Sequence, residues 1–91
     1  MHAELFKNVH EGASQLNGLK LKKLSDYDIG NVIRFWLNEH QVLMPSIKVL
    51  RQIISQVKKI DLESRINIKV DEVSIRSYNN SLFLMNNSEN Q

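Results

Sequence analysis

The sequence contains no cysteine, one proline and three separated glycines among its 91 residues. Without cysteine there are no disulfide bonds and no thiolate chemistry, which is typical of cytoplasmic proteins. Because Gly12, Gly18 and Gly30 stand apart, no glycine-rich loop precedes a helix to bind phosphates. No apolar run approaches the roughly 20 residues that a membrane span requires, and residues 1–4 do not resemble a secretory leader, so we expect none. We therefore expect a cytoplasmic protein with no membrane partner.

Residues that could perform catalysis or bind a metal form no recognisable pattern. His2, His10 and His40 have no companion at the spacing of zinc ligands, so we interpret them as surface residues. Asp71 and Glu72 are adjacent acids at a predicted turn, where such residues are ordinary. We predict no catalytic residue, no metal site and no cofactor in this chain, which argues against a small stand-alone enzyme.

The net charge is only +2, but the positive charges are unevenly distributed. Between residues 18 and 59, eight Lys or Arg accompany three acids. The eight are Lys20, Lys22, Lys23, Arg34, Lys48, Arg51, Lys58 and Lys59. A local excess of this kind indicates a surface that faces phosphates. The plainer alternative is a solvated helix face.

Helical spacing of apolar residues begins near the N-terminus. In residues 4–16 it predicts a helix that ends at Asn17, with Gly18 in the left-handed conformation that often terminates a helix. Residues 18–24 then alternate basic and apolar side chains. We expect an extended connector there, with its leucines facing the core.

Two serines predict the starts of two further helices. Ser25 and Asp28 resemble a capping box, and the helix they open should end near Glu39 and His40. Ser46 follows Pro45 and is expected to cap the next helix, which carries four basic residues and no acid.

The apolar stripes of these helices predict the core. Trp36 lies on the apolar face of the first of the two, so we expect it to be buried rather than to stack on RNA. In the corner between them, Val42, Leu43 and Met44 are expected to close over the core.

After Ile60 the apolar period changes from 3.6 to 2, which predicts strands. The predicted order is a strand over 66–70, a turn at 71–72, a strand over 73–78, a tight turn at 79–80, a strand over 81–85 and a polar tail over 87–91. The expected fold is thus α+β, with two to three helices followed by a small three-stranded antiparallel meander.

Three stretches, in this order and with these separations, resemble one known family. Residues 32–37 (VIRFWL) are similar to a Leu-Arg-Tyr-Trp-Leu segment, and residues 44–46 (MPS) to a Met-Pro-Ser helix start. Residues 73–84 resemble a closing hairpin with an Arg-x-Tyr strand, although Ser77 stands where the family often has a second arginine. The family is the middle, substrate-binding domain of tRNA(Ile)-lysidine synthetases, and the similarity runs from about Leu24 to Leu84.

The resemblance implies a parent enzyme that uses ATP and Mg to adenylate the wobble cytidine of a minor isoleucine tRNA and then joins lysine to it, forming lysidine. That chemistry resides in an N-terminal domain with a Ser-Gly-Gly-x-Asp-Ser loop, which this sequence lacks. The implied role of the present chain is to hold tRNA(Ile) for the catalytic domain of the same polypeptide. Residues 1–18 would then be a connector helix from that domain, and residues 19–86 the tRNA-contacting domain.

Positioning a tRNA requires contacts to phosphates more than readout of bases. Our predicted tRNA-binding residues are Arg34, Lys48, Arg51, Lys58, Arg76 and Tyr78. Arg34 has a structural alternative, because long arginine stems often pack while the head stays polar. Tyr78 has one as well, since it could pack against Phe83 instead of stacking on a base. A small basic protein–protein interaction module would share the same charge pattern and is the competing function.

Overall fold

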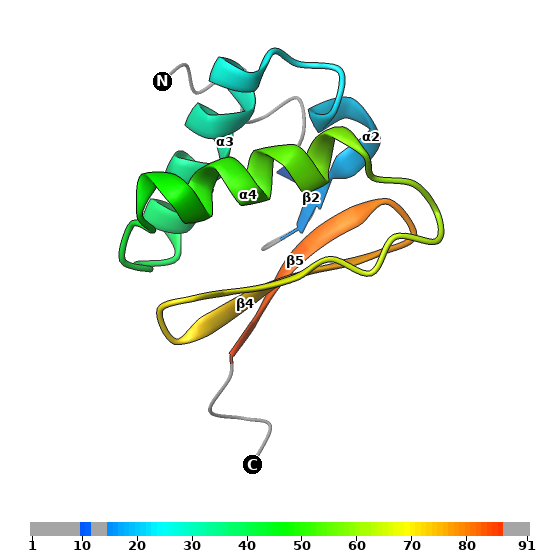
Figure 1. Ribbon diagram of the computed structural model, residues 1–91. Coiled ribbons are helices and arrows are strands. Elements are labelled where there is room, and N and C mark those ends of the chain that lie inside the picture. The colour runs from blue at the N-terminus through cyan, green and yellow to red at the C-terminus, as the bar shows by residue number, and fades with distance from the viewer. Residues whose placement is uncertain (1–9, 12–14, 87–91) are drawn as a thin grey trace.

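The computed structural model describes residues 10–11 and 15–86, and their elements form two layers (Figure 1). The elements are β1 His10–Glu11, β2 Gln15–Asn17, α2 Gly18–Leu21, α3 Asp26–Glu39, α4 Ile47–Lys58, β3 Asn67–Val70, β4 Val73–Tyr78 and β5 Ser81–Asn86. Helices α3 and α4 pack side by side on one face of an antiparallel sheet, which confirms the predicted α+β class.

The sheet has the strand order β1-β2-β5-β4-β3, and every neighbouring pair is antiparallel. Strands β3, β4 and β5 form the predicted meander, but the sheet is larger than the three strands expected, because β1 and β2 extend it from the segment before the helices. Asn79 and Asn80 join β4 to β5 with φ values of 50° and 68°, so the tight turn expected from two asparagines is confirmed. Asp71, with φ 56°, makes the corresponding turn between β3 and β4.

The N-terminal segment is a strand where we predicted a helix. β2 pairs with β5, and this register sets Leu16 opposite Leu82, both fully buried. The prediction of a helix over residues 4–16 is therefore wrong at 10–11 and 15–16, and the remainder lies outside the described residues. Burial of Leu16 beside a strand some 65 residues later in the chain outweighs the local helical spacing, because strand preference depends strongly on packing neighbours.

The predicted extended connector after Asn17 is also wrong at its start, because α2 is one helical turn. The Asn17 side chain accepts a hydrogen bond from the Lys20 backbone N–H at 3.0 Å and so caps this turn. Gly18 opens the turn instead of ending a helix and is not left-handed. Its N–H donates to the Asn80 carbonyl at 2.6 Å, an approach so close that a Cβ on Gly18 would collide with that oxygen.

The two serine caps are confirmed. The Ser25 hydroxyl accepts from the Asp28 N–H at 3.1 Å, and the Ser46 hydroxyl accepts from the Val49 N–H at 3.2 Å. Each bond satisfies one of the backbone donors that an α-helix leaves unpaired at its start. His40 ends α3 where the sequence predicted.

The core lies between the helices and the sheet, and Trp36 is fully buried in it as expected. Its largest fully buried members include Trp36, Leu16, Leu21, Ile29, Ile33, Leu37, Ile53, Ile60, Ile75 and Leu82.

In the corner between α3 and α4, only Val42 turns inward. Leu43 and Met44 are 71% and 47% exposed, so our expectation that they close over the core is wrong. Gln41, at the start of this corner, has a φ of 58°.

Candidate functional site

The exposed face of α4 carries cations in its first half and at its end. Leu50, Ile53 and Val57 are buried against the core. Lys48 and Arg51 are exposed, and the helix contains no acidic residue. Helical periodicity thus separates the apolar face from the charged one and leaves the cations in solvent.

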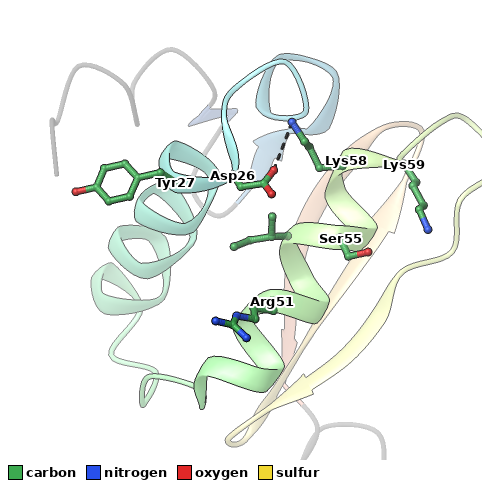
Figure 2. A pocket seen from close by; sticks show the side chains of 7 residues that line it. Asp26, Tyr27, Arg51, Ser55, Lys58 and Lys59 are labelled. Atoms are coloured by element: carbon green, nitrogen blue, oxygen red, sulfur yellow. Dashed lines mark ion pairs between the residues drawn. The ribbon is translucent and has the colours of Figure 1, made fainter.

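A groove of about 730 Å³ runs between the start of α3 and the second half of α4 (Figure 2). It is lined by Asp26, Tyr27, Arg51, Ile54, Ser55, Lys58 and Lys59. Tyr27 points away from α4 (Figure 2). The cations that line the groove are Arg51 and Lys58 of α4 and Lys59, which follows the helix, and the one carboxylate is Asp26 of α3.

Lys58 already has partners within the protein. Its Nζ lies 3.5 Å from Asp26 Oδ1 and donates to the Leu24 carbonyl at 3.1 Å. The side chains of this ion pair are 41% and 72% exposed, so solvent screens the attraction and the pair contributes little to stability. Lys58 therefore joins the end of α4 to the start of α3. Its ammonium group is already partly engaged by these two contacts.

Arg34 and the other two predicted helix cations are less constrained. Within residues 10–11 and 15–86, Arg34, Lys48 and Arg51 have no ion-pair partner. Arg34 is exposed one turn after Gly30, which lies beside the Ile54 side chain of α4. Arg34 is thus on the flank of α3 nearest α4.

Arg76 and Tyr78 lie on the opposite side of the sheet. Side chains alternate between the faces of a strand, and Ile75 of β4 is buried in the core beneath the helices. Arg76 and Tyr78 therefore point away from the helices. They line a second cleft of about 310 Å³ together with Phe83, which pairs with Arg76 across the strands.

The six predicted residues consequently fall into two groups. Arg34, Lys48, Arg51 and Lys58 belong to the helical layer, whereas Arg76 and Tyr78 belong to the outer face of the sheet. The structure does not bring them together in one site.

Two residues that we did not select link these groups. A third cleft is lined by Gln56, Lys59, Ser64, Arg65 and Ile66. Lys59 also lines the groove of Arg51, and Arg65 also lines the cleft of Tyr78. Cations thus continue from α4 past the loop before β3 to the outer face of the sheet. Arg65 gave no signal in the sequence, because Asp61 and Glu63 leave its segment without a positive excess.

Ser77 fixes the loop that carries Arg65. Its hydroxyl accepts from the Ile66 N–H at 2.8 Å and donates to the Ser64 carbonyl at 3.1 Å. The Ser77 N–H donates in addition to the Ile66 carbonyl at 3.2 Å. The guanidinium carbon of Arg65 lies 6.0 Å from the centre of the Tyr78 ring, at the outer limit of a cation–π contact.

A small turn precedes Arg65 and contains the only described group with a clear pKa shift. Asp61 Oδ1 accepts from the Ser64 hydroxyl at 3.1 Å and from the Glu63 N–H at 2.9 Å. The hydroxyl first, and then the backbone donor, stabilise the carboxylate and hold the pKa of Asp61 below its ordinary value.

Within the part of the chain that the structure describes, no three His, Cys, Asp or Glu side chains are grouped as metal ligands. The described helices are all too short or too polar to cross a bilayer.

Comparison with known proteins gives one family. Residues 18–83 match the model of the TilS substrate binding domain. A tRNA(Ile)-lysidine synthase of Legionella pneumophila strain Lens is 29% identical over 65 residues, which cover 71% of this chain and 15% of that protein. The synthase of strain Paris is 26% identical with the same coverage. No solved structure shows significant similarity.

The match includes the two capped helices, the meander as far as residue 83 and all six predicted site residues. This chain spans about 15% of the length of these relatives. Because the family model covers most of the chain, the protein belongs to the family of TilS substrate-binding domains.

Proposed function

We propose that this chain is the tRNA-positioning domain of an ATP-dependent tRNA(Ile)-lysidine synthetase, which converts the wobble cytidine of minor isoleucine tRNA to lysidine. The catalytic steps, ATP and Mg belong to a separate domain of the parent enzyme. The present domain contributes affinity and orientation and binds no cofactor itself. The proposal draws on the family membership and on the names of the relatives.

The observation that carries the proposal is the exposed, acid-free face of α4. Lys48 and Arg51 stand on it without an ion-pair partner in the described chain, so their charges are available to a ligand. RNA offers one phosphate per nucleotide, and each phosphate contact releases condensed counterions, which favours binding. Such contacts fix the position of an RNA without reading its sequence, as a positioning domain requires.

Replacing Lys48 and Arg51 together by glutamate should test this face. We expect the affinity of the chain for minor isoleucine tRNA to fall at least tenfold at moderate salt, because two attractive contacts become repulsive. Lys58 is left unchanged, since its bonds to Asp26 and Leu24 also join the helices. Equilibrium binding to the tRNA and to an unrelated RNA of equal length is the measurement.

A matched control changes the same net charge elsewhere. Lys20 and Lys23 are exposed around α2, outside the groove between α3 and α4. Replacing both by glutamate should weaken tRNA binding much less. Equal losses in the two double variants would mean that only overall charge matters. Full tRNA affinity in the Lys48 and Arg51 variant would contradict the proposal and favour the protein-interaction alternative.

A further inference from the structure

The outer face of the sheet combines aromatic rings with cations. Asn67, Arg76 and Phe83 lie opposite one another on β3, β4 and β5, and Tyr78 follows two residues after Arg76 on the same face. Helices α3 and α4 pack on the other side of the sheet (Figure 1). The Tyr78 side chain is 60% exposed, so its ring is accessible to a ligand.

Two arginines from different elements line the cleft together with this ring. Arg65 comes from the loop before β3, and its guanidinium carbon lies 6.0 Å from the Tyr78 ring centre. Arg76 comes from β4, and its Nε is buried without a hydrogen-bond partner in the described chain. A buried donor of this kind is costly unless it finds an acceptor, so Arg76 would gain a partner by turning this group toward an anionic oxygen in the cleft.

The loop that holds Arg65 is bonded firmly to β4. Ser77 makes hydrogen bonds to both Ser64 and Ile66, the two neighbours of Arg65 in the chain. This bonding places Arg65 beside Tyr78 before any ligand arrives, so little ordering is required on binding.

We infer that this cleft binds an unpaired nucleotide of the RNA, with its base stacked on Tyr78 and its phosphate held by Arg65 and Arg76. The inference rests on the proposed function, because it takes RNA as the ligand. An exposed ring beside two cations suits a single-stranded nucleotide, since its base has a free face for stacking. The bases of a continuous duplex are stacked on each other and offer no such face.

The test compares two probes, a single-stranded octanucleotide of uridine and a blunt RNA duplex of eight base pairs. Replacing Tyr78 by alanine should lower affinity for the single strand on the order of 5- to 100-fold, as loss of one base–aromatic contact does. Affinity for the duplex should not change. Tyr78→Phe keeps the ring and should bind the single strand nearly as well as the natural chain.

Arg65→Gln gives an independent measurement at an exposed loop position. It should reduce the dependence of single-strand affinity on salt, lowering the slope of log K against log salt by roughly 0.7 for one phosphate contact. Leu43→Ala, an exposed apolar truncation outside all three clefts, is the matched control and should leave both slope and affinity unchanged.

Equal weakening of both probes by Tyr78→Ala, or no weakening of either, would overturn the inference. An unchanged slope in Arg65→Gln would do so as well. The proposed function is tested separately, by the Lys48 and Arg51 variant. If the Lys48 and Arg51 variant loses tRNA while Tyr78→Ala keeps the single strand, only the nucleotide cleft is wrong. If neither variant loses any RNA, both are wrong.

Discussion

At the scale of single residues, Gly18 and Gly30 differ in the space that a side chain would find. Gly18 donates its N–H to the Asn80 carbonyl, and a Cβ there would meet both this oxygen and the Ile60 side chain. Gly30 lies inside α3, where a methyl group in place of the hydrogen would have Ile54 Cδ1 as its nearest neighbour, at 3.4 Å. The first position excludes a side chain, whereas the second has space for one.

Replacement of each glycine by alanine should therefore change stability in opposite directions. We expect Gly18→Ala to cost about 1–3 kcal/mol through the forced displacement of packed atoms. Gly30→Ala should be neutral or stabilise by up to about 1 kcal/mol, because alanine favours a helix interior. Urea denaturation of both variants is the measurement. A Gly18→Ala protein as stable as the natural chain would show that the start of α2 does not approach Asn80 and Ile60 this closely.

Asp61 offers a test by pH. Hydrogen bonds from Ser64 and Glu63 hold its pKa below the ordinary value of 3.8. A depressed pKa in the folded state means that the contribution of the carboxylate to stability is complete above 3.8 and is lost as pH falls through the lower, folded value. A carbon NMR titration of the Asp61 carboxyl group should give a midpoint below 3.8, and Ser64→Ala should raise it. A midpoint at or above 3.8 in the natural chain would contradict this turn.

At the scale of elements, Ser77 connects a strand with the loop that precedes its neighbour. Ser77→Ala would leave the Ile66 N–H without its hydroxyl acceptor, so we expect a loss of roughly 1–3 kcal/mol in the free energy of unfolding. Ser55, exposed on α4, is the matched control, and Ser55→Ala should cost nothing because alanine is the better helix former. Equal stability of the two variants would show that the hydroxyl does not fix the loop.

Elements with a complete local signal were predictable. Helices α3 and α4 each have a serine cap followed by an apolar stripe, and the β4–β5 hairpin has two asparagines at its turn. β2 and α2 have no such signal. β2 is a strand because Leu16 packs beside Leu82, and α2 begins where Gly18 meets Asn80. Both depend on residues more than 60 positions away, which a local pattern does not contain.

At the scale of the whole molecule, the candidate site was predictable in composition and not in arrangement. Periodicity showed that Lys48 and Arg51 lie off the apolar stripe of their helix. It could not show that Arg76 and Tyr78 face the other way, because that depends on which side of the sheet the helices cover. For the same reason Arg65 was missed: only the fold places it beside Tyr78.

The positions of the cations determine the path that a bound RNA would take around the domain. Cations of the helical layer and of the outer sheet face are linked through Lys59 and Arg65 along one side of the domain. An RNA that contacts both groups would have to wrap around this side. Binding would then depend strongly on salt, because contacts to phosphates dominate it.

The central claim is that α4 binds the phosphates of tRNA, and the most direct measurement is the salt dependence of that binding. Affinity for minor isoleucine tRNA would be measured across a series of salt concentrations for the natural chain and for a Lys48→Gln, Arg51→Gln variant. Loss of two phosphate contacts should reduce the slope of log K against log salt by about 1.8. An identical slope in the two proteins would contradict the claim, because the cations of α4 would then contact no phosphate.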